Sequence, residues 1–332
     1  MKLMYLAFTA KGKALADALA AALGGSAMRC NQPLNLAAWT KAAFAGADGL
    51  VFVGAAGIAV RAVAPCLQSK AADPAVVVVD ECGRYAVPIL SGHLGGANAL
   101  ARRIAGACGA IPVLTTATDA NGVFAVDEWA KRQGCAILDV QRVKAVSAAL
   151  LAGGTVRVKS AWPVLGEPPP GLTLAAENED AEVLLDLHQK DTAALRLVPK
   201  IAVLGVGCKR GTARQALEQA LQALLAGTGM CAQAICCVAS IDLKQEEPGL
   251  LAFCKAHGWA LHTYTAARLQ SVPGRFTPSA FVQKVTGVDN VCERSAVLAA
   301  GGALYQGKQA GGGVTMAVAL KPYQPDWRWQ DA

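Results

Sequence analysis

Four consecutive valines precede an acid in the stretch Val76-Val77-Val78-Val79-Asp80. Successive side chains of a strand point to opposite faces of the sheet, so a run without polar alternation suits a strand that is buried on both faces. Such strands occur in mostly parallel sheets that carry helices on both sides. Apolar segments at 49–53 and 111–114 alternate with helical patterns at 13–23 and 98–108. The first third of the chain is therefore predicted to be an α/β unit.

A second α/β unit begins near Lys200, where an apolar segment at 201–204 leads through a glycine-rich loop into a helical pattern at 213–226. Before it, Glu167-Pro168-Pro169-Pro170-Gly171 breaks any regular element. We predict two α/β domains with mostly parallel sheets joined by a small irregular middle region. The expected segments are an N-terminal domain at 1–134, a middle region or linker at 135–199, and a C-terminal domain at 200–332.

Composition limits the class of protein. Of 332 residues, 54% are hydrophobic and 17% are charged, which excludes a disordered chain. No apolar run approaches the length of a membrane span, and the first residues do not resemble a secretory signal, so no membrane-spanning or targeting segment is expected. The eleven cysteines are irregularly spaced without a Cys-x-x-Cys pair, which favours buried free thiols in a reducing cytoplasm over a metal site.

The net charge of +7 favours an acidic partner. From charge alone, nucleic acid, an anionic membrane surface and a polycarboxylate substrate all remain open.

The loop Ser91-Gly92-His93-Leu94-Gly95-Gly96-Ala97-Asn98 joins a predicted strand to a predicted helix. Its glycines let backbone amides approach a bound group, and exposed amides at a helix start favour an anion. Open α/β sheets place their sites in such loops, so His93 is a candidate functional residue. A helix-capping loop in which His93 only makes a local hydrogen bond is the other interpretation.

A second polar loop, Thr115-Thr116-Ala117-Thr118-Asp119-Ala120-Asn121-Gly122, follows the segment at 111–114. If the sheet is parallel, this loop, the glycines Gly54 and Gly57, and Asp80-Glu81 lie along one edge, where ligands bind. The same residue types also form ordinary capped turns, so that alternative stays open.

The loop Gly205-Val206-Gly207-Cys208-Lys209-Arg210-Gly211-Thr212 is only a weak nucleotide motif, because its third glycine is one place late and a P-loop pattern is missing. Lys209 and Arg210 beside loop amides suit an anion site. A solvated basic turn explains them equally well.

Together these motifs make the chain resemble the CbiG family of cobalamin biosynthesis, the cobalt-precorrin-5A hydrolases. The N-terminal resemblance is carried by residues 54–61, 70–81, 91–98 and 115–122. The C-terminal unit is similar to the CobE/CbiG C-terminal domain, and that similarity is carried by residues 205–212, 239–244 and 291–293.

The resemblance implies an enzyme that opens the ring A δ-lactone of cobalt-precorrin-5A and releases a two-carbon unit as acetaldehyde, giving cobalt-precorrin-5B. It implies no organic cofactor and no protein-bound metal, because cobalt is carried by the substrate and the conjugated macrocycle accepts the electrons. The expected partner is thus a small-molecule cobalt-corrinoid intermediate, with transient contact to neighbouring pathway methyltransferases, and neither nucleic acid nor a membrane is expected as a partner.

Lactone hydrolysis needs an activated water and donors for an oxyanion. We expect His93 to be the general base, the Gly95 and Gly96 amides to be oxyanion donors, and Asp119 or Glu81 to orient His93 or take the second proton. The residues expected to contact substrate are Gly54, Gly57, Arg61, Ser91, Gly95, Gly96, Asn98, Thr115, Thr116, Asn121, Lys209 and Arg210.

Two other classes of function remain. A non-catalytic carrier of corrinoid intermediates could use the same basic loops, and a nucleotide-dependent α/β enzyme is disfavoured by the faulty fingerprints.

Overall fold

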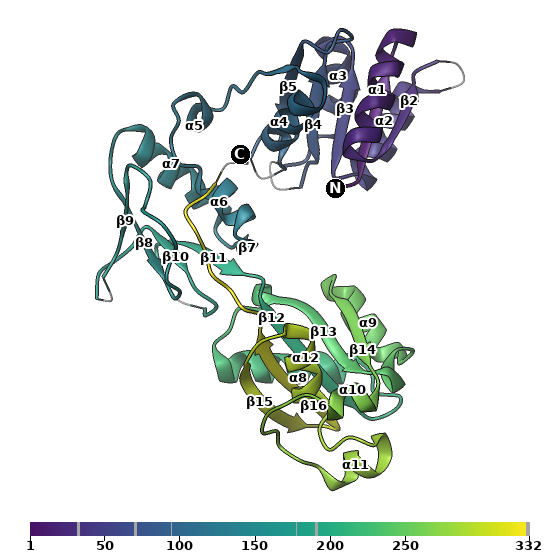
Figure 1. Ribbon diagram of the computed structural model, residues 1–332, viewed down its shortest axis with the longest axis vertical. Coiled ribbons are helices and arrows are strands. Elements are labelled where there is room, and N and C mark those ends of the chain that lie inside the picture. Colours follow the sequence, from purple (N-terminus) through teal and green to yellow (C-terminus); the bar gives the residue numbers. More distant parts are fainter. Residues whose placement is uncertain (32–33, 70–71, 94, 177, 190–191, 330–332) are drawn as a thin grey trace.

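The computed structural model describes residues 1–31, 34–69, 72–93, 95–176, 178–189 and 192–329. These residues form three α/β units that follow one another along the chain, each on its own sheet (Figure 1). The first two sheets are mostly parallel, and in the third sheet two strand pairs are parallel and two are antiparallel. The predicted α/β class is therefore confirmed. No helix of the described part of the chain has the length and apolar character needed to cross a bilayer.

The N-terminal unit has a six-stranded sheet in the order β2-β1-β3-β4-β5-β6. Its strands are β1 (Leu3–Ala7), β2 (Ser26–Arg29), β3 (Gly49–Val53), β4 (Ala75–Val79), β5 (Tyr85–Leu90) and β6 (Ile111–Pro112). Its helices are α1 (Ala10–Leu23), α2 (Leu36–Gly46), α3 (Ala56–Val63), the 3-10 turn η1 (Ala64–Cys66), α4 (Ala97–Cys108) and α5 (Ala117–Ala120).

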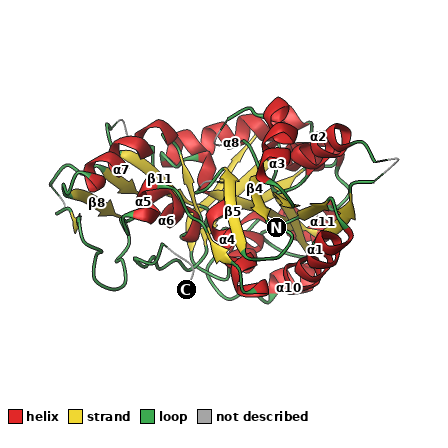
Figure 2. Ribbon diagram, turned by 90° about the horizontal axis from the view of Figure 1, so that it is seen from above, coloured by secondary structure: helices red, strands yellow, loops and turns green. Residues whose placement is uncertain are grey.

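The valine run forms β4 and is buried on both faces, as predicted. Val77 and Val79 pack in the cluster that contains α1 and α4. Val76 and Val78 pack on the opposite face with α2 and α3. Figure 2 shows these two helix pairs on either side of the central strands.

One strand pairing sets the position of the loops. Strand β5 runs antiparallel to β4, with Val79 opposite Ala86 and Val76 opposite Leu90. The turn between the two strands forms around Asp80, whose carboxylate accepts hydrogen bonds from the backbone amides of Cys82, Arg84 and Tyr85. Since β6 is parallel to β5, the loops after β5 and β6 both lie at the edge where β3 and β4 begin.

The middle region is more regular than predicted, because it contains a five-stranded sheet in the order β7-β11-β10-β8-β9. Its strands are β7 (Cys135–Ile137), β8 (Val156–Ser160), β9 (Leu172–Leu174), β10 (Val183–Leu185) and β11 (Leu195–Pro199). Its helices are α6 (Val126–Arg132), η2 (Val140–Arg142) and α7 (Val143–Leu151). The proline run lies in the loop between β8 and β9, where it does end regular structure.

The end of the chain returns to this middle unit, seen as the yellow segment beside α6 in Figure 1. Trp327 stacks on Trp129 of α6 with ring centroids 5.3 Å apart. The Trp129 indole Nε1 donates a hydrogen bond of 2.6 Å to the Asp326 carbonyl. The core of the middle unit is therefore completed by residues from the far end of the sequence.

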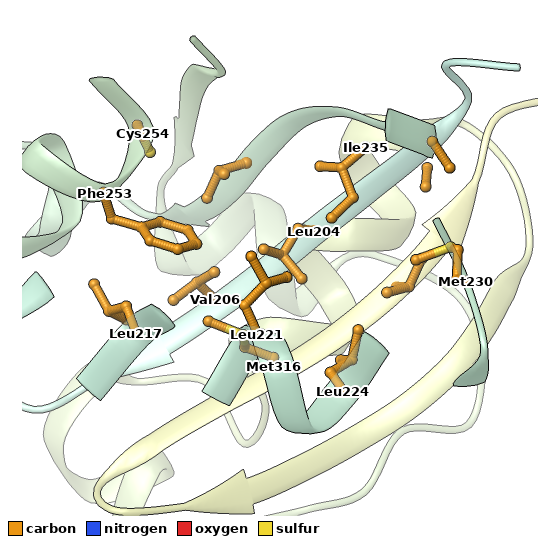
Figure 3. Close-up of a cluster of buried hydrophobic side chains, with 14 of the residues drawn as sticks. Leu204, Val206, Leu217, Leu221, Leu224, Met230, Ile235, Phe253, Cys254 and Met316 are labelled. Atoms are coloured by element: carbon orange, nitrogen blue, oxygen red, sulfur yellow. The ribbon is translucent and has the colours of Figure 1, made fainter. Parts of the chain in front are cut away.

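The C-terminal unit has a five-stranded sheet in the order β14-β13-β12-β16-β15. Its strands are β12 (Ala202–Cys208), β13 (Ile235–Ile241), β14 (Ala260–Tyr264), β15 (Leu304–Gly311) and β16 (Val314–Leu320). Its helices are α8 (Arg214–Thr228), η3 (Ala232–Ala234), η4 (Asp242–Lys244), α9 (Pro248–His257), α10 (Ala266–Gln270), α11 (Ala280–Thr286) and α12 (Cys292–Ala300). Figure 3 shows the core of this unit, in which Leu217, Leu221 and Leu224 of α8 meet Leu204 and Val206 of β12.

Candidate active site

His93 lies in the loop between β5 and α4, where the N-terminal unit meets α6 of the middle unit. Its Nε2 atom is 2.9 Å from Asp119 Oδ2, and its Nδ1 atom is 3.2 Å from Asp127 Oδ2. Glu128 Oε1 is 3.8 Å from Nε2. The structure thus joins the predicted pair of His93 and Asp119 and adds two acids that the sequence analysis did not identify.

The loop that holds His93 is tightly folded. Among the described residues, Ser91 is the one non-glycine residue in the left-handed region, with φ of 56°, and its buried hydroxyl has no hydrogen-bond partner. A side chain at Gly95 would collide with Ser91, and Gly96 has a left-handed φ of 86°. The two glycines therefore permit the turn, whereas Leu94 lies outside the described residues.

The Gly96 amide is not available for the oxyanion role that we expected. It donates a hydrogen bond of 3.0 Å to the carbonyl of His93. Any oxyanion donor at this loop must therefore come from a side chain or from another amide.

Asp119 is held by several donors. Asn98 Nδ2 donates to its Oδ2 over 2.8 Å, Thr116 Oγ1 also donates to Oδ2, and the Arg102 guanidinium pairs with Oδ1. Burial by itself would raise the pKa of Asp119, but the hydrogen bonds from His93 and Thr116 and the charge of Arg102 hold it well below its usual range. Asp119 is thus a fixed anion that positions His93.

The same contacts determine the charge of His93. Burial alone would lower the pKa of the imidazole, but the hydrogen bonds to Asp119 and Asp127 and the charges of Asp127 and Glu128 raise it to about 10. His93 is therefore a cation at neutral pH. A free imidazole acting as the first general base, as we expected, does not fit this resting state.

Glu128 has the opposite character. Its side chain is 9% exposed, and its Oε2 atom is buried without a hydrogen-bond partner. Burial raises the pKa of this carboxyl to about 7, against the lowering effect of the His93 charge. Glu128 can therefore exchange a proton near neutral pH, which is the property required of a general base.

A cavity of about 220 Å³ opens beside these groups. It is lined by His93, Gly96, Ala99, Arg102, Glu128, Lys131, Arg132 and Trp329. Pockets that enclose a whole drug-sized ligand measure roughly 300–1,000 Å³. This cavity suits a water molecule and one reacting group of a larger substrate.

The cluster also has the geometry of a cation site, since ligand atoms of His93, Asp119 and Glu128 lie within 4.8 Å of one another. However, Arg102 and Thr116 already donate to Asp119, and the raised pKa of His93 favours a protonated ring over a ligand. The two cations His93 and Arg102 already offset the negative charge of the acids. We therefore keep the expectation that this site uses no metal.

The remaining predicted residues of the second polar loop differ in their surroundings. Thr116 and Asn98 belong to the Asp119 network, with 3.0 Å between Asn98 Nδ2 and Thr116 Oγ1. Asn121 Nδ2 donates to the Ala117 carbonyl over 2.8 Å, which is the helix-capping alternative. Thr115 is exposed.

Four predicted residues, Gly54, Gly57, Arg61 and Glu81, lie at the opposite edge of the sheet. Gly54 and Glu81 follow the ends of β3 and β4, whereas His93 follows β5, which runs the other way. The length of β4, at about 3.3 Å per residue, separates the two edges by roughly 15 Å. The prediction of one shared edge is therefore wrong.

The hydrogen bonds of Arg61 and Glu81 join them to residues at their own edge of the sheet. Arg61 Nη1 donates to the Gly57 carbonyl over 3.3 Å, and Glu81 Oε2 accepts a hydrogen bond of 2.7 Å from Thr9 Oγ1. Glu81 is thus too far from His93 to orient it. That task falls to Asp119.

Lys209 and Arg210 lie in a third place, the loop after β12. Gly205 in the preceding strand is required for packing, because a side chain there would collide with the Cys292 carbonyl. The Gly211 amide donates a hydrogen bond of 2.7 Å to Glu247 Oε1, so a carboxylate occupies the donor that a phosphate would need. The Gly211 amide is therefore not available to a phosphate, which adds to the weakness of the nucleotide motif.

Sequence reasoning missed Arg102, Asp127 and Glu128. Arg102 lies one helical turn beyond Asn98 on α4, so the i, i+4 spacing could have indicated it. Asp127 and Glu128 stand in the first turn of α6, where acids are common because they favour the helix dipole. Their role depends on a contact between units that no local pattern shows.

Comparison with known proteins agrees with this architecture. Three family models match in order along the chain: Cobalamin synthesis G N-terminal at residues 38–119, Cobalamin biosynthesis central region at 124–226 and Cobalamin synthesis G C-terminus at 202–319.

Curated relatives extend the similarity over most of the chain. The chain is 34% identical over 301 residues to Cobalt-precorrin-5A hydrolase of Priestia megaterium, covering 84% of this chain and 80% of that protein. It is 35% identical over 294 residues to the protein of the same name in Salmonella typhimurium strain LT2, covering 84% and 83%. Protein CobE of Sinorhizobium sp is 34% identical over 100 residues, which are 30% of this chain and 65% of that protein. The chain therefore belongs to the CbiG family of cobalamin biosynthesis and is an enzyme of the hydrolase class.

Proposed function

We propose that this enzyme opens the ring A δ-lactone of cobalt-precorrin-5A and releases the two-carbon unit as acetaldehyde, giving cobalt-precorrin-5B. The observation that carries the proposal is that a cationic His93 lies beside Glu128, whose pKa is about 7, at the wall of a cavity. His93 can donate a proton as a general acid, and Glu128, whose pKa is about 7, can accept one as a general base. Such a pair suits the hydrolysis of an ester bond. The names of the curated relatives support the choice of substrate.

In the first step, Glu128 takes a proton from a water molecule whose oxygen bonds to the lactone carbonyl carbon. The His93 imidazolium stabilises the tetrahedral oxyanion, a role that the Gly96 amide cannot fill. When the lactone C–O bond breaks, the leaving oxygen takes the proton of His93. The products are a carboxyl group and a secondary alcohol.

In the second step, His93 is neutral and accepts the proton of that alcohol. The C–C bond breaks as the alcohol carbon becomes the carbonyl of acetaldehyde, and the bonding electrons pass into the conjugated imines of the macrocycle. Asp119 keeps the imidazole in place through both steps. No organic cofactor takes part, and cobalt belongs to the substrate.

The test supplies anaerobic cobalt-precorrin-5A and couples released acetaldehyde to NADH consumption by an alcohol dehydrogenase. We expect His93→Asn and Glu128→Gln each to lower turnover by roughly 100-fold or more, the usual range for losing a general acid or base. Matched controls are His257→Asn and Glu218→Gln, because His257 Nε2 and Glu218 Oε2 form a similar 2.8 Å pair in the C-terminal unit. Near-normal turnover in the folded His93→Asn variant would remove His93 from the mechanism.

The same assay separates an enzyme from a carrier of corrinoid intermediates. An enzyme forms acetaldehyde in large excess over protein, at a rate proportional to protein concentration. A chain that forms none above the uncatalysed reaction, yet binds the macrocycle, would be the carrier.

A further inference from the structure

The C-terminal unit holds a cavity of about 1130 Å³, much larger than the one beside His93. It lies at the carboxyl ends of β12 and β13, the edge where α/β sheets bind ligands. Its wall is formed in part by the loop of Lys209 and Arg210, by the turn η4 and by helix α11. The volume exceeds that of ordinary drug-sized pockets and suits a large ligand.

Three strongly exposed hydrophobic side chains lie on its wall. Phe281, Leu243 and Val285 are 69%, 64% and 61% exposed, the highest values among the large hydrophobic side chains that the structure describes. All three line this cavity. Phe281 and Val285 are four residues apart on α11, so they share one face of that helix. Clustered exposure of this kind marks a binding surface.

The charges of the wall favour an anionic ligand. Lys209, Arg210 and Lys308 line the cavity. Arg210 lies close enough to Glu247 for its charge to lower the pKa of that carboxyl, although Glu247 has its ion pair with Lys244. Glu246 also lines the cavity, and among the described residues no ion pair involves its carboxylate.

The other ionised groups on the wall are already paired. Lys244 Nζ lies 2.9 Å from Glu247 Oε2, and Asp289 Oδ1 lies 2.8 Å from Arg294 Nε. Among the described groups of the wall, the cations Lys209, Arg210 and Lys308 therefore outnumber the acid Glu246, which leaves an excess of positive charge beside an apolar surface.

We infer that this cavity binds the macrocycle of a corrinoid polycarboxylate, with its flat face on Phe281, Val285 and Leu243 and its acetate and propionate groups on Lys209, Arg210 and Lys308. The choice of ligand class rests on the proposed function. The cavity itself is separate from the His93 cluster, since α11 and α4 lie in opposite halves of the molecule (Figure 1). The chain thus has one site for reaction and a second site for holding the macrocycle.

The experiment measures binding of cobyrinic acid, a cobalt corrinoid with free carboxylates, to the full chain by equilibrium dialysis. We expect Lys209→Glu combined with Lys308→Glu to weaken binding at least 10-fold, because two cationic contacts become repulsive. Phe281→Ser should weaken it several-fold with little effect on folding, because this side chain is largely exposed. Matched controls are Lys284→Glu, an exposed lysine of the same helix α11, and Leu251→Ser, an exposed leucine of α9. Neither lines the cavity.

A second ligand tests recognition of the carboxylates. Cobinamide, whose side chains are amides, should bind at least 10-fold more weakly than cobyrinic acid. Equal affinity for the two corrinoids would overturn the inference, as would unchanged binding in the Lys209/Lys308 variant. Unchanged binding in Phe281→Ser would also overturn it and assign the apolar surface to a protein contact.

These outcomes are independent of the proposed function. Binding that is lost in Glu128→Gln but kept in the Lys209/Lys308 variant would place the macrocycle at the His93 cluster and reject this second site. Binding that behaves as expected in a chain that releases no acetaldehyde would reject the hydrolase proposal and leave the second site intact.

Discussion

Replacing Glu128 with glutamine should make the protein more stable and less active at the same time. Burial raises the pKa of Glu128 from 4.5 to about 7, so the folded protein holds this proton more tightly than the unfolded chain does. At about 1.4 kcal/mol for each tenfold change in proton affinity, ionising Glu128 costs the folded state roughly 3 kcal/mol. Glutamine has almost the same shape and carries no charge, so it avoids this cost.

The sign of the effect depends on pH. Below about pH 4.5 the carboxyl is neutral in both states, and wild type and Glu128→Gln should have similar free energies of unfolding. As the pH rises from there to about 7, the wild type loses stability relative to the variant. Above about pH 7 the difference should remain near 3 kcal/mol.

The assay is urea unfolding near pH 5 and near pH 8, followed by tryptophan fluorescence. Trp129 lies in α6 next to Glu128, so the signal reports this part of the molecule. Glu218→Gln on α8 is the control. A variant that is less stable than wild type near pH 8, or a difference that does not change with pH, would refute the argument from burial, and undiminished turnover would refute the catalytic role.

Three further results should follow. The rate of acetaldehyde release should rise as the pH increases through about 7, because Glu128 must lose its proton to act as a base. The rate should stay high until His93 deprotonates near pH 10. A rate that is flat across pH 7 would contradict this assignment. Trp327→Ala should destabilise the middle unit by about 3–5 kcal/mol, since it removes the ring stacked on Trp129, and denaturant unfolding should show the loss without a change in the cobyrinic acid affinity. Prolonged dialysis against a chelator should leave turnover unchanged; loss of activity that an added divalent cation restores would show that His93, Asp119 and Glu128 hold a metal.

The strands and helices of the outer units were largely predictable because their cores follow local patterns. The run Val76 to Val79 indicated a strand buried on both faces, and β4 has that environment. The middle unit was not predictable, because β7, β9 and β10 have only three residues each and the core depends on Trp327 from the end of the chain. A strand of three residues has too few side chains to show the alternation of apolar and polar residues that predicts a strand.

The predicted position of the candidate site was wrong because of one connection between strands. Only five residues, 80–84, lie between β4 and β5, whereas a parallel crossover needs a dozen or more. The short connection with Gly83 therefore indicated a hairpin, and a hairpin places the His93 loop at the edge opposite Gly54 and Glu81. That signal was present in the sequence, and applying it would have separated the two groups of candidate residues.

The chemistry of His93 arises from a contact between two units. Within its own unit, His93 has Asp119 as its acidic partner, while Asp127 and Glu128 come from α6 of the middle unit. The pKa of the imidazole is raised partly by those two acids, and the pKa of Glu128 is raised because the same contact buries it. Separating α6 from the loop would therefore remove both the acid and the base in their useful ionisation states. The catalytic property belongs to the junction, which explains why each loop taken alone also fits an ordinary capped turn.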